Sequence, residues 1–134
     1  MTALTVLVGE DVGEANMARM AVAHPGVLFH LCLTDEEYLA VAPHADIIFS
    51  KKFIPAAVQA ATRLRWIQAG TAGVNHILAM GIDRRDVLLT NARGAHGTPM
   101  AELILAQMLA FATGHHTLLR TQSARGRVGK QVIR

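Results

Sequence analysis

The sequence predicts an α/β fold: a flavodoxin-like, doubly wound parallel sheet of about five strands, followed by a long C-terminal helix. Short apolar runs rich in β-branched residues alternate with helical or crossover-length segments. The runs are almost continuously apolar, which is typical of parallel strands covered on both faces. Hydrophobic residues make up 51% of the 134 residues and aromatic residues only 4%, which favours helices and a buried sheet over an all-β fold.

The predicted strands are bounded by glycine, proline or helix-capping signals. They span residues 4–8, 27–33, 45–49, 65–69 and 86–91. The first is followed by a helix over residues 13–23, which Pro25 and Gly26 stop. Thr34 and Glu37 have the spacing of a capping box and predict a short helix that ends by Pro43. Pro55 suits the first turn of a further helix through residue 61, and a short helical pattern covers residues 76–80.

A long apolar helix is predicted from Thr98, as N-cap, and Pro99, in the first turn, to about residue 119. Its apolar side chains cover about half of the circumference, so the helix needs partners on more than one face. We expect a homo-oligomer, such as a dimer, through residues 98–119. The apolar stretch is shorter than a membrane span and contains Glu102 and Gln107, so no membrane partner is expected.

The net charge of +3 is unevenly distributed along the chain. Residues 1–102 carry eight basic and ten acidic side chains, whereas residues 103–134 carry five basic and no acidic ones. The basic tail lacks interleaved aromatic residues and any known motif, so nucleic-acid binding is not expected. Cys32 is the one cysteine, and no signal-like segment opens the chain, so we expect a cytoplasmic protein without an internal disulfide.

Several kinds of site are disfavoured by the residues present. The turn after the first strand contains Glu10 and Asp11 in place of a G-x-G-x-x-G motif, and these carboxylates would repel a pyrophosphate. The same acid pair suits a phospho-receiver domain, but Ser50 occupies the position of its phosphorylated aspartate. The seven histidines form no ligand pair at i, i+4 spacing, so no metal site is expected. Cys32 lies in an apolar run and is interpreted as a core residue.

The loop Gly70-Thr71-Ala72-Gly73-Val74-Asn75 follows the fourth predicted strand and precedes a short helical pattern. Its small residues would let backbone N–H groups approach an anion, with help from a helix dipole. An ordinary tight turn between strand and helix explains the same residues equally well.

Three motifs together resemble the D-isomer-specific 2-hydroxyacid dehydrogenases. They are the segment from Trp66 to His76 that contains this loop, the segment Asp86-Val87-Leu88-Leu89-Thr90-Asn91-Ala92-Arg93-Gly94, and Met100-Ala101-Glu102 at the start of an apolar helix. The resemblance implies that residues 1–95 are the family's substrate-side, or catalytic, domain. Residues 96–134 would be the interdomain crossover helix and the start of a nucleotide-binding domain. Gly129-Lys130-Gln131-Val132-Ile133 is similar to the strand that leads into that domain's glycine motif.

The resemblance also implies roles for individual residues. The backbone of Ala72 and Gly73 would receive the carboxylate of a 2-oxo acid, with Val74 adjoining, and Thr71 would lie near the nicotinamide of the cofactor. Asn91 and Gly94 would mark the hinge between the domains. Two further features have no assigned role: His96 stands where the family often has asparagine, and Lys51 and Lys52 could line the cleft or simply be exposed loop residues.

The family's catalytic Arg, Glu and His would all lie downstream of Arg134, so no catalytic residue is predicted within this chain. NAD or NADP would serve the complete enzyme, and we expect neither tight cofactor binding nor dehydrogenase activity from these 134 residues. A 2-oxo or 2-hydroxy acid would bind only weakly. The alternative is a non-catalytic oligomeric interaction or regulatory module that keeps the fold.

Overall fold

The computed structural model describes residues 3–82 and 86–123. Contacts within the chain divide it into two compact units, Met1–Arg93 and Gly94–Arg134. Much of the predicted basic tail, including the segment at residues 129–133, lies outside the described residues.

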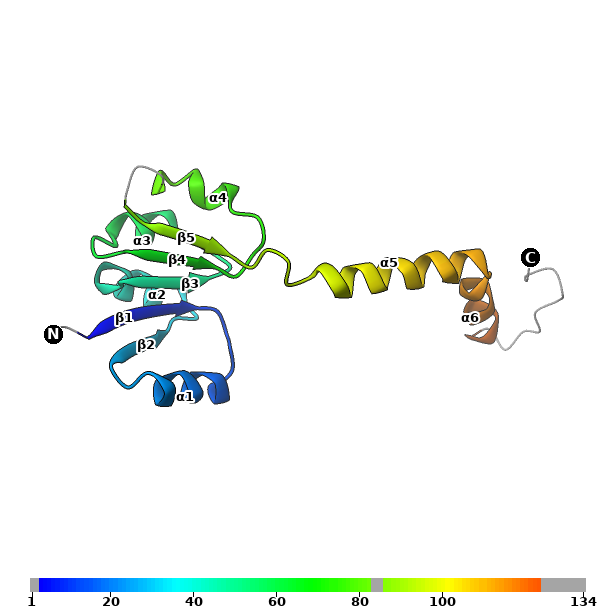
Figure 1. The fold of residues 1–134 in the computed structure, drawn as a ribbon, viewed down its shortest axis with the longest axis horizontal. Helices are drawn as coiled ribbons and strands as arrows, with labels where there is room; N and C mark the ends of the chain where they lie inside the picture. Colours follow the sequence, from blue (N-terminus) through cyan, green and yellow to red (C-terminus); the bar gives the residue numbers. More distant parts are fainter. Residues whose placement is uncertain (1–2, 83–85, 124–134) are drawn as a thin grey trace. The chain divides into compact units, whose positions relative to one another are not determined.

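The first unit contains a parallel sheet of five strands in the order β2-β1-β3-β4-β5 (Figure 1). The strands are β1 (Leu4–Gly9), β2 (Val27–Leu31), β3 (Ile47–Ser50), β4 (Trp66–Ala69) and β5 (Leu88–Asn91). This arrangement confirms the predicted fold class. Several strands are shorter than predicted, because flanking residues keep single ladder bonds only: the Cys32 N–H donates to the Val8 carbonyl, and the Asp46 N–H donates to the Thr5 carbonyl.

The helices of this unit follow the predicted signals closely. They are α1 (Glu14–Ala23), α2 (Asp35–Val41) with the 3-10 turn η1 (Ala42–His44), α3 (Pro55–Ala60) and α4 (Asn75–Leu78). The predicted capping box is confirmed: the Glu37 N–H donates to Thr34 Oγ1 at 3.2 Å, and the Thr34 N–H donates to Glu37 Oε2 at 3.1 Å. Because these bonds satisfy backbone groups at both positions, they fix the start of α2.

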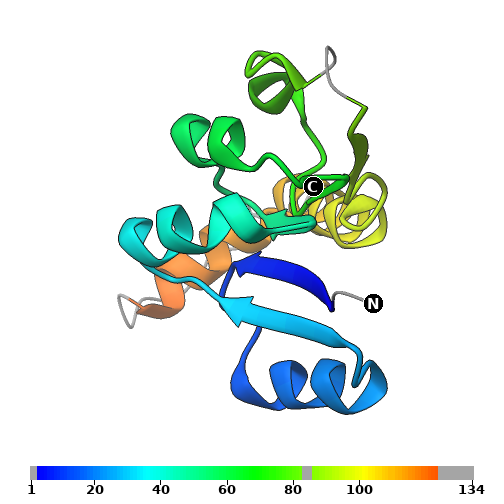
Figure 2. The same ribbon diagram turned by 90° about the vertical axis from the view of Figure 1, so that its left-hand side faces the viewer.

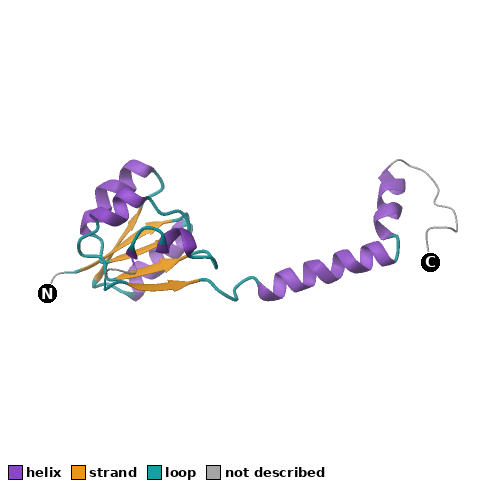
Figure 3. Cartoon of the chain, turned by 90° about the horizontal axis from the view of Figure 1, so that it is seen from above, coloured by secondary structure: helices purple, strands orange, loops and turns teal. Residues whose placement is uncertain are grey.

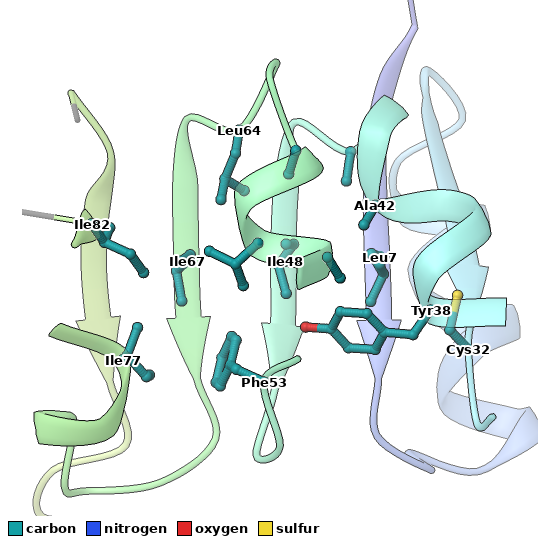
Figure 4. Packing of buried hydrophobic residues seen from close by; sticks show 14 of the residues in the cluster. Leu7, Cys32, Tyr38, Ala42, Ile48, Phe53, Leu64, Ile67, Ile77 and Ile82 are labelled. Atoms are coloured by element: carbon teal, nitrogen blue, oxygen red, sulfur yellow. The ribbon is translucent and has the colours of Figure 1, made fainter. Parts of the chain in front are cut away.

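The hydrophobic core lies between one face of the sheet and the helices α2, α3 and α4 (Figures 2 and 4). Leu7, Ile48 and Ile67 stand side by side on β1, β3 and β4 and are fully buried. Tyr38 of α2 and Ile77 of α4 close the core from the helix side. Cys32 belongs to the same cluster, which confirms its interpretation as a core residue.

The other face of the sheet is less completely covered. Residues on β3 and β4 alternate between buried and half-buried, and Phe49 and Trp66 are among the half-buried ones. Helix α1 lies over this face, where it lines a groove with Phe49, yet no residue of α1 is buried. The apolar strands predicted a sheet covered on both faces. Within the described part of this unit, one face is fully covered and the other only partly.

A buried carboxylate joins β1 to the segments before β3 and β4. Asp46 accepts the Thr5 N–H at 2.9 Å and receives Arg63 Nη2 at 3.1 and 3.0 Å on its two oxygens. The Asp46 carbonyl also accepts the Arg65 N–H at 2.8 Å. These bonds satisfy the carboxylate of a residue that is only 7% exposed, as a buried charge requires.

The described part of the second unit, up to residue 123, contains two helices, α5 (Gly97–Ala112) and α6 (His115–Ser123), rather than the one helix predicted over residues 98–119 (Figure 3). Gly114 adopts a left-handed φ of +71°, and its N–H donates to the Phe111 carbonyl at 3.2 Å. Such a glycine ends a helix, and the Gly114 carbonyl then accepts the N–H groups that open α6. The predicted start was also wrong: His96, not Thr98, is the N-cap, without a side-chain capping bond.

Helix α5 exposes nearly all of its large apolar side chains. Ile104, Leu109 and Phe111 are 52%, 64% and 69% exposed. No helix in the described ranges is long and apolar enough to cross a membrane.

Candidate functional site

The segment Gly70–Val74, here called the β4–α4 loop, leaves the sheet at the carboxyl end of β4. The Gly70 N–H donates to the Ser50 carbonyl at 2.8 Å, which holds the loop against the end of β3. A Cβ at Gly70 would lie 2.8 Å from Lys51 Cγ, so glycine permits this close passage. Ligands of open α/β sheets bind at this edge, outside the carboxyl ends of the strands.

Three successive carbonyl groups of the loop are held by donors from the first unit. The Thr71 carbonyl accepts the Ala92 N–H at 3.1 Å, and the Ala72 carbonyl accepts Asn91 Nδ2 at 2.7 Å. The Gly73 carbonyl accepts the Thr71 hydroxyl at 2.9 Å. The loop is thereby fixed to the end of β5 and to itself.

The N–H groups that follow these carbonyls belong to Ala72, Gly73 and Val74. Within the described residues, no acceptor bonds the backbone N–H of Ala72, Gly73 or Val74. In a trans peptide the N–H points away from the preceding carbonyl, so fixing each carbonyl also fixes the N–H that follows it. Ala72 and Gly73 are exposed, and a Cβ at Gly73 would meet open space. The loop therefore presents three backbone N–H groups that could donate hydrogen bonds to an anion.

The predicted help from a helix dipole is small. Helix α4 has four residues, which is about one turn, and the Val74 carbonyl accepts the N–H groups of Ile77 and Leu78 to begin it. One turn sums few peptide dipoles, so the helix adds little to the donors of the loop itself.

The lysines after β3 are engaged in exposed ion pairs. Lys51 Nζ lies 2.6 Å from Glu10 Oε1, and Lys52 Nζ lies 2.9 Å from Asp35 Oδ1. These pairs neutralise one of the two acids after β1, and they leave neither lysine as an isolated cation at this edge.

The remaining predicted residues fall into separate places. Gly94 has a φ of +89° and is the first residue of the second unit, which suits a hinge. Asn91 ends β5, but its side chain bonds the loop, a role that the sequence analysis missed.

The structure gives Cys32 no reactive character. Burial, followed by the negative charge of Glu37, raises the pKa of the Cys32 thiol and makes it a poor nucleophile. No cluster of three or more metal-ligating side chains occurs among the residues that the structure describes.

A hydrogen-bonded chain on the opposite sheet face also escaped the sequence analysis. Trp66 Nε1 donates to Thr90 Oγ1 at 2.7 Å, and the Thr90 hydroxyl donates to Gln68 Oε1 at 2.6 Å. The register Gln68↔Thr90 brings these residues together, and spacing along the sequence carries no signal of it.

Solved dehydrogenase structures share this fold. A D-isomer-specific 2-hydroxyacid dehydrogenase family protein from Aeromonas salmonicida matches 95% of the chain with a TM-score of 0.76 and 23% identity. A D-lactate dehydrogenase from Aquifex aeolicus, complexed with NAD and lactic acid, matches 97% with a TM-score of 0.73 and 14% identity. A phosphoglycerate dehydrogenase from Lactobacillus plantarum matches 97% with a TM-score of 0.56 and 19% identity.

The chain therefore shares the fold of one part of these dehydrogenases. The chain spans about two fifths of each of these structures, covering 41%, 40% and 42% of their lengths. No family model and no curated protein sequence matches the chain.

Proposed function

We propose that residues 1–95 form the substrate-side domain of an NAD(P)-dependent D-2-hydroxyacid dehydrogenase. The shared fold supports the family, and the β4–α4 loop supports the site. The observation that carries the proposal is in this loop: three carbonyls are hydrogen-bonded, and the three N–H groups that follow them have no acceptor among the described residues.

The backbone N–H groups of Ala72 and Gly73 bind the carboxylate of a 2-oxo acid in this proposal, and Val74 adjoins it. Two fixed donors orient the substrate while leaving its keto carbon open to a reductant. Thr71 lies toward the nicotinamide, with its hydroxyl already donated to Gly73.

The cofactor itself does not fit on the first unit. Glu10 and Asp11 follow β1, where a pyrophosphate would need glycines and free N–H groups, and the 134 residues contain no G-x-G-x-x-G motif. NAD or NADP would supply the hydride in the complete enzyme. We propose that these 134 residues have no dehydrogenase activity by themselves.

Backbone amide resonances test the carboxylate site directly. Titration with pyruvate should shift the amide signals of Ala72 and Gly73 in a weak but saturable manner. Pyruvamide, which has the same keto group without the negative charge, is the matched control and should shift them little. Equal responses to both compounds, or shifts spread over the whole unit, would contradict the site.

A steady-state assay tests the proposed inactivity. Purified residues 1–134 should give no turnover above background with glyoxylate, hydroxypyruvate or pyruvate and either NADH or NADPH. Measurable reduction would show that a cofactor-binding site and an acid catalyst both lie within these 134 residues, and would contradict the proposed inactivity.

The alternative function is an oligomeric interaction or regulatory module without catalysis, and α5 favours it. Met100, Ile104, Met108 and Phe111 form one exposed stripe at helical spacing, and such a surface is unfavourable in water. In this proposal α5 pairs with α5 of a second copy. Sedimentation should show a dimer or larger oligomer at micromolar concentration. Substituting Ile104→Glu and Phe111→Glu together should dissociate it without unfolding the first unit.

A further inference from the structure

Asn91 occupies a junction between the β4–α4 loop and the chain segment that leaves the first unit. It is the last residue of β5 and pairs in register with Ala69, the last residue of β4. The first unit ends two residues later, at Arg93. Asn91 therefore lies between the proposed carboxylate site and the boundary of the two units.

Both ends of the Asn91 side-chain amide are engaged. Nδ2 donates to the Ala72 carbonyl at 2.7 Å, and Oδ1 accepts the Arg93 N–H at 3.4 Å. These two partners determine the orientation of the amide. The Arg93 N–H requires an acceptor, which is Oδ1, and the Ala72 carbonyl requires a donor, which is Nδ2. The neighbouring Ala92 N–H donates to the Thr71 carbonyl at 3.1 Å.

These two donors set the direction of two peptide groups at once. The carbonyls of Thr71 and Ala72 both point toward the Asn91–Ala92 corner. The trans geometry then directs the N–H groups of Ala72 and Gly73 away from that corner, toward the exposed side of the loop. Losing the Asn91 bond would free the Ala72–Gly73 peptide to rotate, and its N–H would no longer be held for a ligand.

We propose that Asn91 is a positioning residue for the carboxylate of a 2-oxo acid. It holds the Gly73 N–H in its binding orientation and connects that peptide, through the Arg93 N–H, to the start of the linker between the units. The inference rests on the proposed function of the loop and adds a second element to it. Carboxylate binding at the loop therefore also changes the surroundings of the backbone amides at residues 91–93.

Asn91→Ala tests the proposal, with Asn75→Ala as the matched control. Asn75 is the first residue of α4, and its side chain makes no hydrogen bond to the residues described. Titration of the amide resonances with pyruvate should show a loss of affinity of about 3- to 10-fold for Asn91→Ala, the range expected for one hydrogen bond. Asn75→Ala should bind like the original chain. In the original chain the Ala92 and Arg93 amides should shift together with Ala72 and Gly73, and in Asn91→Ala the Arg93 response should disappear.

A second pair of variants keeps the proposal testable if Asn91→Ala does not fold. Asn91→Asp keeps the shape of the side chain but turns a carboxylate oxygen toward the Ala72 carbonyl, whereas Asn75→Asp adds the same charge without touching that carbonyl. Asn91→Asp should lose more affinity for pyruvate than Asn75→Asp. Trp66 fluorescence checks that the first unit stays folded.

The outcomes separate the two proposals. If the original chain shows no saturable shift with pyruvate, the proposed carboxylate site fails and the role of Asn91 fails with it. The other outcome concerns Asn91 alone. If the original chain binds pyruvate and each variant at position 91 binds it as tightly as the matching variant at position 75, the role of Asn91 is overturned.

Discussion

The two units of the chain place similar side chains in opposite environments. In the first unit, Ile48, Ile67 and Ile77 are fully buried between the sheet and its helices, whereas in α5 Ile104 and Phe111 are 52% and 69% exposed. Burying one such side chain contributes about 1.5–3 kcal/mol. The first unit obtains this contribution within its own core. Helix α5 buries none of its side chains, so apolar content alone does not reveal which segments are buried.

Truncating one isoleucine in each unit tests this contrast and has the largest expected effect. Ile67→Ala removes a fully buried side chain from the core side of β4 and should lower the free energy of unfolding by about 2–5 kcal/mol. Ile104→Ala in α5 should change it by less than about 0.5 kcal/mol. Urea unfolding followed by the fluorescence of Trp66, the chain's one tryptophan, measures the first unit in both variants.

The contrast would break if Ile104→Ala destabilised the first unit as strongly as Ile67→Ala. That result would mean that the exposed side chains of α5 contribute to the stability of the first unit.

The edge of the core near the carboxyl end of β1 is a sharper test of tight packing. A Cβ at Gly9 would lie 2.6 Å from Tyr38 Cε2 and 2.7 Å from Ser50 Oγ. Gly9→Ala should therefore destabilise the first unit by about 1–3 kcal/mol, because the Tyr38 ring is buried in the core and has little freedom to move. The same urea titration measures it.

Gly26→Ala is the matched control for Gly9→Ala. A Cβ at Gly26 meets nothing within 4 Å, and its φ is not in the left-handed region. This variant should be neutral or more stable by up to about 1 kcal/mol, since alanine restricts the unfolded chain. Equal losses from both substitutions would show that the effect at Gly9 is not a packing effect.

The sequence predicted the first unit well because its signals are local. The capping box at Thr34 and Glu37, the proline that opens α3 and the apolar strands each act within a few residues, and all appear in the structure. The division of the predicted long helix was missed although Gly114 is visible in the sequence. Apolar residues resume at Leu118 and Leu119, and that periodicity outweighed the glycine.

The residues of the candidate site could be predicted from the sequence, but the hydrogen bonds that position them could not. Small residues in the β4–α4 loop point to close approach of a ligand to the backbone, a property that the sequence displays directly. The bond from Asn91 to the Ala72 carbonyl joins residues 19 positions apart, and only the register of β4 with β5 brings them together. Side-chain bonds across such pairings have no local pattern in the sequence.

A smaller effect, set by pH, distinguishes the helices of the two units. The Thr34 N–H and then the Leu33 N–H donate to the Glu37 carboxylate and hold the pKa of that carboxyl below its usual value. A lowered native pKa means that the charged cap stabilises the fold above the unfolded pKa, and that this stability is lost as pH falls through the native pKa. Helix α5 has no acidic residue in its first turn and no side-chain cap, so its start has no such titration.

Glu37→Gln isolates this term, because glutamine can still accept the backbone bonds but does not titrate. At pH 7 the original chain should be more stable than Glu37→Gln, since a charged acceptor binds N–H groups more strongly. Between about pH 5 and pH 3 the difference should shrink toward zero, as measured by urea unfolding followed by Trp66. A difference that is constant over this range, or that grows as pH falls, would show that the Glu37 carboxylate does not stabilise α2 through its charge.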